Sequence, residues 1–364
     1  MFRRTLLTVA TSCLLFGCNQ PAPQSLNHAS IPNRRAELQN TLARVPLAES
    51  WDLILPRTTL HRLYLEEDIL FAETQSGWVY AIDSNSGRTL WTLELSDSDT
   101  VRHLDHRPGL SSTHVALISS GVLHIVKRKH GELTHKVVLP FAAMSPATPV
   151  GNRVYVGGHD NYLYAFNYVK GIRDWRFSTD GDIITKPLYK APYIYFASGD
   201  KRIYQIQETT GKQVFALPTI GEVGADMTTE GPSVLATTLD NRVYNITNGI
   251  LQWKFFSDHE LRTPSIATKT AVFVVDRAPT LYCIDRGHGT EKWRAGDIRQ
   301  YLFRGTQHDF ALQGKHWLVR LHSEDGTIDG RYDLSAFDFF LTNPDTNALY
   351  VGTHDGALFC LTEQ

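Results

Sequence analysis

The feature that most constrains this chain is a short motif that recurs about every 40 residues. In its first copy, residues 77–83 read GWVYAID, a glycine follows at position 87, and a tryptophan follows at position 91. With Tyr80 as the anchor of this copy, equivalent anchors are His124, Tyr164, Tyr204, Tyr244, Tyr282, Val319 and Phe359. Their spacing of 37 to 44 residues is typical of an architecture in which each repeat forms one four-stranded propeller blade. The pattern predicts an all-β propeller.

Each copy pairs two apolar strands and adds an outer strand. In the third copy, residues 154–156 and 162–167 are apolar, and Asp160-Asn161 between them suits a tight hairpin turn. Nearly continuous apolar strands are expected where both faces of a sheet are covered, as they are between neighbouring blades. A glycine seven residues and an aromatic residue eleven residues after the anchor recur, as in Gly171 and Trp175. The glycine permits a left-handed turn, and the indole is expected to fill the gap between blades.

The number of blades follows from the two ends of the repeat region. The last copy ends soon after Phe359, before an outer strand, whereas residues 49–53 around Trp51 read as an outer strand with no anchor before it. Pairing these two ends closes the ring and covers two exposed strand edges. We therefore predict an eight-bladed β-propeller over residues 47–364, closed by the N-terminal strand. A seven-bladed ring is the alternative if the seventh copy is spurious.

Composition supports a large packed core and excludes some partners. The chain is 42% hydrophobic and has a formal net charge of −2. This charge does not indicate a surface for nucleic acid or for an anionic membrane. Of the four cysteines, only Cys283 and Cys360 fall in the repeats, at the same position two blades apart. This separation exceeds what a disulfide allows, so both are predicted to be small buried hydrophobic residues.

The N-terminus is predicted to be a targeting signal. Arg3 and Arg4 precede an apolar run that is too short to span a bilayer, so residues 1–17 are interpreted as a signal peptide. Residues 15–18 resemble the lipobox of bacterial lipoproteins, which implies lipid attachment at Cys18, with an ordinary cleaved signal peptide as the alternative. By the same resemblance, Asn19 favours delivery to the outer membrane, facing the periplasm. Residues 18–46 are predicted to be a flexible tether, with one or two turns of helix over residues 35–42 as the alternative for that part.

The motifs Leu163-Tyr164-Ala165-Phe166 with Trp175, and residues 281–285 with Trp293, resemble the tryptophan-docking pattern of the PQQ-like propeller repeat. A lipid-anchored propeller of this size is similar to the BamB family of the outer-membrane β-barrel assembly machinery. The resemblance implies a non-catalytic scaffold, a monomer within a complex, whose partner is a β-barrel insertase. Residues 182–187 lack the arginine of that family's contact loop, so no contact residues are carried over.

The alternative is a quinoprotein dehydrogenase or another ligand-binding propeller. Such enzymes hold a quinone and Ca²⁺ on the propeller axis and often carry a disulfide between adjacent cysteines. The chain has no Cys-Cys pair, no long insertions to form a cofactor chamber, and no cluster of carboxylate and amide side chains typical of a calcium site. We therefore predict no enzymatic activity and no cofactor.

The histidines do not predict a metal site. His159-Asp160 and His354-Asp355 occupy the same turn in two repeats, which repeat geometry explains. His103 and His106 form an isolated pair, fewer than the three or four ligands that zinc uses. The acidic residues 66–68 are interpreted as solvated turn carboxylates rather than as an acid–base pair.

Two irregular segments between repeats are the predicted partner-binding regions. Residues 97–112 and 296–307 lie where loops ring a propeller face. Arginine and aromatic residues are common anchors of protein interfaces. The candidate contacts, with solvent loops as the alternative interpretation, are Arg102, Arg107, Arg299, Tyr301 and Arg304.

Overall fold

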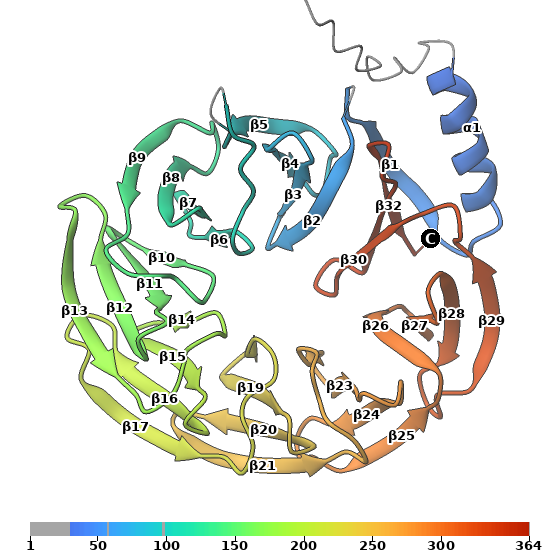
Figure 1. The fold of residues 1–364 in the computed structure, drawn as a ribbon. Coiled ribbons are helices and arrows are strands. Elements are labelled where there is room, and N and C mark those ends of the chain that lie inside the picture. The colour runs from blue at the N-terminus through green and yellow to red at the C-terminus, as the bar shows by residue number, and fades with distance from the viewer. Residues whose placement is uncertain (1–29, 57, 97–98, 364) are drawn as a thin grey trace, which may run out of the picture.

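Eight four-stranded antiparallel sheets stand around a central axis in the computed structural model, which describes residues 30–56, 58–96 and 99–363 (Figure 1). This arrangement confirms the prediction of an all-β, eight-bladed propeller. The predicted signal peptide and the predicted lipid attachment site Cys18 lie outside the described residues. Among those described, no helix is long and apolar enough to cross a membrane.

Each blade takes its strands in chain order from the channel outward. Blade 1 contains β2(Leu60–Glu66), β3(Ile69–Thr74), β4(Trp78–Asp83) and β5(Thr89–Glu94). Blade 2 contains β6(Gly109–Leu110), β7(His114–Ser119), β8(Val122–Lys127) and β9(Leu133–Val138). Blade 3 contains β10(Thr148–Val150), β11(Arg153–Gly157), β12(Tyr162–Asn167) and β13(Ile172–Ser178). Blade 4 contains β14(Leu188–Lys190), β15(Tyr193–Ser198), β16(Arg202–Gln207) and β17(Gln213–Pro218).

Blades 5 to 7 follow the same order, and blade 8 takes its outer strand from the N-terminal part of the chain. Blade 5 contains β18(Thr228–Glu230), β19(Ser233–Thr238), β20(Arg242–Thr247) and β21(Ile250–Phe256). Blade 6 contains β22(Ile266–Ala267), β23(Ala271–Val275), β24(Leu281–Asp285) and β25(Glu291–Ala295). Blade 7 contains β26(Ile298–Arg304), β27(His308–Gln313), β28(Trp317–His322) and β29(Ile328–Asp333). Blade 8 contains β30(Phe339–Asn343), β31(Ala348–Gly352), β32(Ala357–Thr362) and β1(Ala48–Ile54).

The hydrophobic core lies between neighbouring blades. The middle strands are buried on both faces, as in β3 and β31, where every residue is buried. One core cluster joins Phe71 and Trp91 of blade 1 to Val115 and Leu117 of blade 2. The continuous apolar strands therefore serve two interfaces at once, which is why they do not alternate.

In six of the eight blades, an aromatic residue of the outer strand docks on the next blade. The Trp253 indole donates a hydrogen bond to the Arg286 carbonyl at 2.8 Å, and its ring covers Gly289. A Cβ built on Gly289 would lie 2.6 Å from that ring. The docked pairs are Trp51 on Gly87, Trp91 on Gly131, Trp175 on Gly211, Phe215 on Gly249, Trp253 on Gly289 and Trp293 on Gly326.

The N-terminal strand closes the ring. β1 pairs with β32 in antiparallel register, with Trp51 opposite Cys360. The Trp51 indole donates a hydrogen bond to the Ser84 carbonyl of blade 1 at 2.9 Å. One residue thus links blade 8 to blade 1, as the unpaired outer strand in the sequence indicated.

In the described part of residues 18–46, the structure forms a helix that contains residues 35–42 and is longer than the one or two turns given as the alternative to a tether. Helix α1(Ser30–Leu42) packs on the ring beside blades 7 and 8 (Figure 1). Leu38 and Leu42 are buried in a core cluster with Phe337 of the segment between those blades. These two leucines lie four residues apart, so they share the face of the helix that meets the core.

Candidate functional site

Two of the predicted partner contacts belong to the core. Tyr301 lies in β26, the inner strand of blade 7, and stacks on Phe273 with ring centroids 3.8 Å apart. Its hydroxyl donates to the buried Asp309 carboxylate at 2.7 Å, and Arg304 donates to the same carboxylate at 2.9 Å. Burial, with the nearby Asp309 charge, raises the pKa of Tyr301 well above its ordinary value. Tyr301 is buried, so its predicted partner-binding role is wrong, whereas the Arg304 side chain is partly exposed and its role stays a prediction.

The other three candidates lie in different surroundings. Arg299 is exposed on β26, and Arg102 is partly buried, with its backbone N–H donating to Ser96 Oγ at 3.1 Å. Arg107 instead reaches the central channel. The structure does not bring the three into one surface, and Arg102 and Arg299 stay predictions.

Four charged side chains meet in the channel, and we call them the channel cluster: Glu66, Arg107, Lys186 and Asp226. Glu66 ends the inner strand of blade 1 and accepts hydrogen bonds from Arg107 at 2.7 Å and from Lys186 at 2.5 Å. Asp226 forms an ion pair with Arg107 and accepts from the Lys186 backbone N–H at 2.5 Å. Glu66 is buried, so its interpretation as a solvated turn carboxylate is wrong.

These contacts connect distant parts of the ring. Lys186 precedes blade 4 and Asp226 precedes blade 5, on the far side of the channel from blade 1 (Figure 1). The two carboxylates, which would be the natural ligands of Ca²⁺, are already paired with cationic side chains that repel such an ion. The described residues on the axis therefore do not fit a quinone held with calcium.

Two neighbouring inter-blade segments present exposed apolar side chains. We call residues 179–187 and 219–227 the loop pair. Ile184 in the first segment is 54% exposed and Ile220 in the second is 61% exposed. Ile184 and Glu222 both line a small hollow of about 40 Å³, so the segments are adjacent. The same two segments contain the acidic residues Asp180, Asp182 and Glu222.

Repeated hydrogen bonds hold the loop pair in place. Thr179 Oγ1 donates to the Gly181 carbonyl at 2.7 Å, and Thr219 Oγ1 makes the same bond to Gly221 at 2.8 Å. Backbone bonds then tie the second segment to blade 5, including Leu239 N–H to the Glu222 carbonyl at 2.9 Å. The exposed isoleucines therefore stand on ordered backbone.

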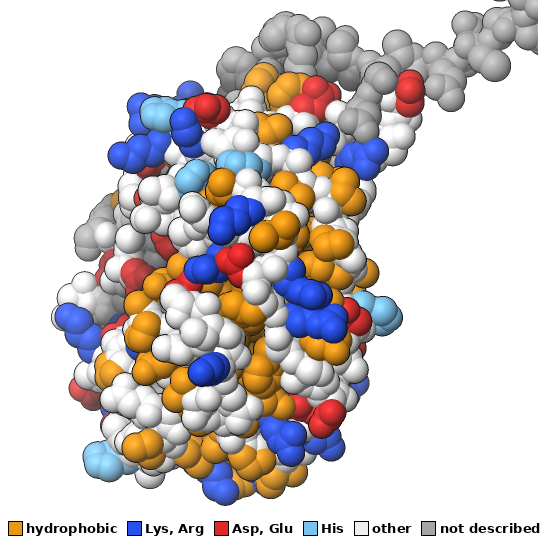
Figure 2. All heavy atoms as spheres, turned by 90° about the vertical axis from the view of Figure 1, so that its left-hand side faces the viewer, with side chains coloured by type: hydrophobic (Ala, Val, Ile, Leu, Met, Phe, Trp, Pro, Cys, Tyr) orange, Lys and Arg blue, Asp and Glu red, His pale blue; other side chains and the backbone are white. Residues whose placement is uncertain are grey.

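Other exposed apolar residues lie on the outer strands. They include Val138 in β9, Ile172 in β13, Val214 in β17 and Ile250 in β21. Figure 2 views the side of the molecule that carries β9 and β13, where hydrophobic side chains are interrupted by Lys and Arg. The outer strands β9, β13, β17 and β21 each present between one and three exposed apolar residues, with three in β21 (Ile250, Leu251 and Phe256).

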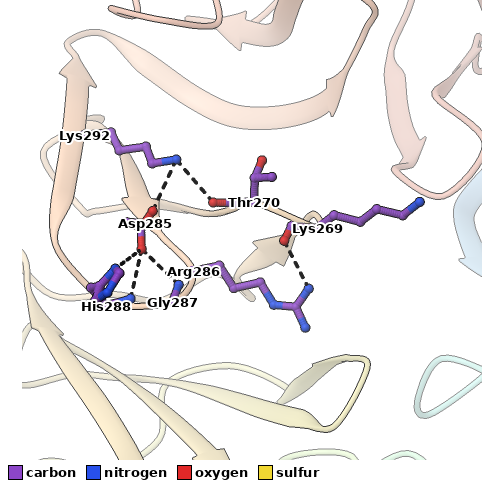
Figure 3. Close-up of a pocket in the computed structure, with 7 residues that line it drawn as sticks. All are labelled: Lys269, Thr270, Asp285, Arg286, Gly287, His288 and Lys292. Atoms are coloured by element: carbon purple, nitrogen blue, oxygen red, sulfur yellow. Dashed lines mark hydrogen bonds and ion pairs between the residues drawn. The ribbon is translucent and has the colours of Figure 1, made fainter.

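An open hollow of about 480 Å³ on blade 6 is lined by basic and acidic side chains (Figure 3). Lys292 lies 3.4 Å from Asp285, and the His288 ring lies 3.0 Å from the same carboxylate. The His288 backbone N–H and ring hold the pKa of Asp285 below its ordinary value. Arg286 turns away to Glu230 at 3.3 Å, so these groups pair with neighbours rather than converge on the hollow.

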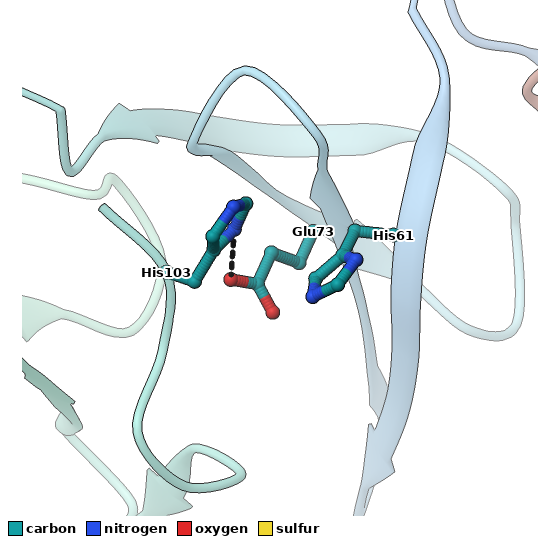
Figure 4. A group of neighbouring side chains, drawn as sticks. All are labelled: His61, Glu73 and His103. Atoms are coloured by element: carbon teal, nitrogen blue, oxygen red, sulfur yellow. Dashed lines mark hydrogen bonds and ion pairs between the residues drawn. The ribbon is translucent and has the colours of Figure 1, made fainter. Parts of the chain in front are cut away.

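A histidine–carboxylate group lies at the junction of blades 1 and 2: His61 from β2, Glu73 from β3 and His103 from the segment between the blades (Figure 4). The His103 Nδ1 atom lies 3.1 Å from Glu73 Oε1. The two imidazole rings have centroids 4.5 Å apart. Burial lowers the pKa of His61, although the Glu73 charge acts in the opposite direction.

This group was missed because its members are remote in sequence. Of the predicted pair, only His103 belongs to it; His106 lies 3.2 Å from the Ala143 carbonyl in the segment between blades 2 and 3. The sequence does not show which residues of β2 lie opposite which residues of β3. Only the observed register, in which Arg62 pairs with Glu73, places Glu73 near His61. No short motif joins the three positions.

Comparisons with known proteins agree with the fold. The family model described as "Outer membrane protein assembly factor BamB" matches residues 75–188 and 181–270. The protein of that name from Shewanella oneidensis is 23% identical over 331 residues, which cover 80% of this chain and 82% of that protein. The one from Yersinia pestis is 23% identical over 142 residues, which cover 39% of this chain and 28% of that protein.

Other similarities are shorter or concern the fold alone. Tetrathionate hydrolase from Acidithiobacillus ferrooxidans is 26% identical over 149 residues, which cover 41% of this chain and 26% of that protein. The crystal structure of BamB from Moraxella catarrhalis superimposes with a TM-score of 0.69 at 16% identity and covers 87% of this chain and 97% of that one. Because the family model spans more than half of the chain, the protein belongs to the family of outer membrane protein assembly factor BamB.

Proposed function

We propose that this protein is an accessory of outer-membrane β-barrel protein assembly that acts by binding other proteins and catalyses no reaction. The observation that carries the proposal is the loop pair, which exposes Ile184 and Ile220 on ordered backbone within the part of the chain that the family model matches. In the channel cluster, Glu66 is already paired with Arg107 and Lys186, which does not favour binding of calcium with a quinone at these described residues.

The loop pair has the properties of a protein-binding surface. Burying an exposed isoleucine side chain contributes roughly 1.5–3 kcal/mol to binding. Because the segments are already hydrogen-bonded, little conformational freedom is lost when a partner binds. Asp180, Asp182 and Glu222 of the same segments favour a partner that offers an apolar pocket with a basic rim.

The proposed partner is the β-barrel insertase of the outer membrane. In this proposal Cys18 carries the lipid that holds the propeller at the inner surface of the outer membrane, in the periplasm. The protein would then be a monomeric subunit of a larger complex.

Affinity purification from detergent-solubilised membranes tests the proposal. The insertase should co-purify with the full-length chain, and Ile184→Asp with Ile220→Asp should reduce its recovery at least about tenfold, since burying a charge at each contact costs more than 1.4 kcal/mol. Ile250→Asp is the matched control, because Ile250 is 64% exposed but lies on an outer strand. Unchanged recovery with the loop-pair variant would refute this surface, and absence of the insertase would refute the function.

The predicted arginine contacts enter the same experiment. If the interface extends to Arg102 and Arg299, Arg102→Ala and Arg299→Ala should each lower recovery of the insertase. Wild-type recovery with both changes would remove these two residues from the proposed contact surface.

A further inference from the structure

Glu73 has an unsatisfied carboxylate oxygen inside the protein. Its side chain is fully buried, and Oε2 has no hydrogen-bond partner. A buried carboxylate is expected to be paired, hydrogen-bonded through both oxygens, or bound to a metal ion. The free oxygen lies in the group that contains His61 and His103.

The other oxygen of Glu73 is held by its surroundings. Oε1 accepts a hydrogen bond from the Leu104 backbone N–H at 2.7 Å. The Leu104 carbonyl in turn accepts from Arg62 at 3.1 Å. Metal-binding carboxylates are commonly oriented by such outer hydrogen bonds, which leave one oxygen for the ion.

The two histidines complete a set of three ligands. One nitrogen of each ring and one Glu73 oxygen all lie within 4.8 Å of one another. Ligands of a tetrahedral zinc ion stand about 3.3–3.6 Å apart, given bonds of about 2.0–2.2 Å, so small rotations of the half-buried imidazoles suffice. His103 is also partly exposed, which gives an ion a route from solvent.

We propose that His61, Glu73 and His103 form a Zn²⁺ site that fastens the segment between blades 1 and 2 to the blade 1 sheet. The two nitrogens and one carboxylate oxygen suit zinc, whereas calcium and magnesium prefer all-oxygen sites. Three protein ligands leave a fourth position for water or for a side chain of a partner. This site reverses the expectation from sequence that no metal is bound, and it does not rest on the proposed function.

The second histidine group on the ring differs in its carboxylate, which is exposed rather than buried. His308, His322 and Asp329 also come within reach of one another. However, Asp329 already accepts a hydrogen bond from Arg320 at 2.8 Å. An arginine on the carboxylate competes with a cation, so His322 serves as a control.

Zinc titration of the full-length, metal-stripped protein in detergent tests the proposal. Calorimetry should show saturation at one Zn²⁺ per chain, and zinc should raise the temperature of unfolding because it binds the folded state. His61→Ala and Glu73→Gln should each weaken binding by roughly 100-fold, since even outer-shell changes cost 10- to 100-fold. Co²⁺ should give visible absorption of a nitrogen- and oxygen-bound ion that these variants lose.

His106→Ala and His322→Ala are the matched controls and should bind zinc like the wild type. Circular dichroism without zinc verifies that each variant is folded, and the half-buried His61→Ala remains informative if Glu73→Gln unfolds. Absence of saturable zinc binding, unchanged binding by His61→Ala, or loss of binding in His322→Ala would each overturn the site.

Discussion

Single buried side chains show which polar groups the propeller tolerates between its blades. Asp309 is fully buried, and it accepts hydrogen bonds from both Tyr301 and Arg304. The arginine also lies over the Phe273 ring, 5.1 Å from its centroid. Such a network is stable because each charge is paired and hydrogen-bonded, whereas removing one partner leaves the other unsatisfied.

The two core cysteines give a prediction about pH. Both are free and buried, and burial raises the pKa of Cys283 to about 11 and that of Cys360 to about 12. Because the thiolate is the reactive form, native protein at about pH 8 should resist alkylation at both residues, whereas urea-unfolded protein should be labelled fully. Mass spectrometry of the two cysteine-containing peptides measures this.

The same shifts determine how stability changes in alkali. Above about pH 8.5, the unfolded chain loses thiol protons that the folded chain retains, so the free energy of unfolding should fall until the folded pKa values are reached. Rapid labelling of either cysteine in native protein at about pH 8 would contradict their burial.

At the scale of the element, the docking of an outer-strand aromatic residue on the next blade is the contact that recurs around the ring. Gly171 and Gly211 occupy the same turn in blades 3 and 4, each with φ of +67°. A Cβ on Gly211 would lie 2.7 Å from the Trp175 ring, whereas a Cβ on Gly171 would meet no atom within 4 Å. The difference arises because blade 2 carries His135 where six of the other blades carry tryptophan or phenylalanine.

This pair separates backbone strain from packing. Gly171→Ala should cost about 1–2 kcal/mol, since only the left-handed conformation is penalised. Gly211→Ala should cost about 1–3 kcal/mol more, because the methyl group also overlaps the indole. Urea unfolding of both variants gives the comparison, and equal losses would mean that the tryptophan does not pack on the glycine.

The repeat therefore predicted strands and docking pairs well, and it failed where an element departs from the repeat. β26 was interpreted as an irregular segment because two bulges, between Ile298 and Gln300 and between Tyr301 and Phe303, break its alternation. Most of helix α1 was interpreted as a tether because its sequence is mainly polar, with few apolar residues besides Leu38 and Leu42. Contacts set by strand register, such as those of Glu73, have no local signature.

At the scale of the whole molecule, one N-terminal strand completes the ring. Trp51→Ala should lower the free energy of unfolding by about 3–5 kcal/mol, because it removes a buried indole, its bond to Ser84 and its cover on Gly87. Trp78→Ala is the control: this tryptophan is only partly buried and is outside the docked pairs, so less than about half of that loss is expected. Urea unfolding measures both, and similar losses would contradict a special role for ring closure.

The ring of blades also determines the position of the loop pair. The blades hold segments 179–187 and 219–227 side by side, although they are 40 residues apart in the repeat. The sequence led to partner contacts being predicted elsewhere. In the sequence alone, isoleucines between acidic residues look like part of an ordinary polar turn, and only the structure shows that they are exposed.

Photo-crosslinking in intact cells tests the central claim most directly. A photoreactive amino acid replaces Ile184 in one strain and Ile250 in another, both exposed in the free protein. We predict that irradiation joins the chain to the outer-membrane β-barrel insertase from position 184 and not from position 250. Equal crosslinking from both positions, or crosslinking from neither, would contradict the account.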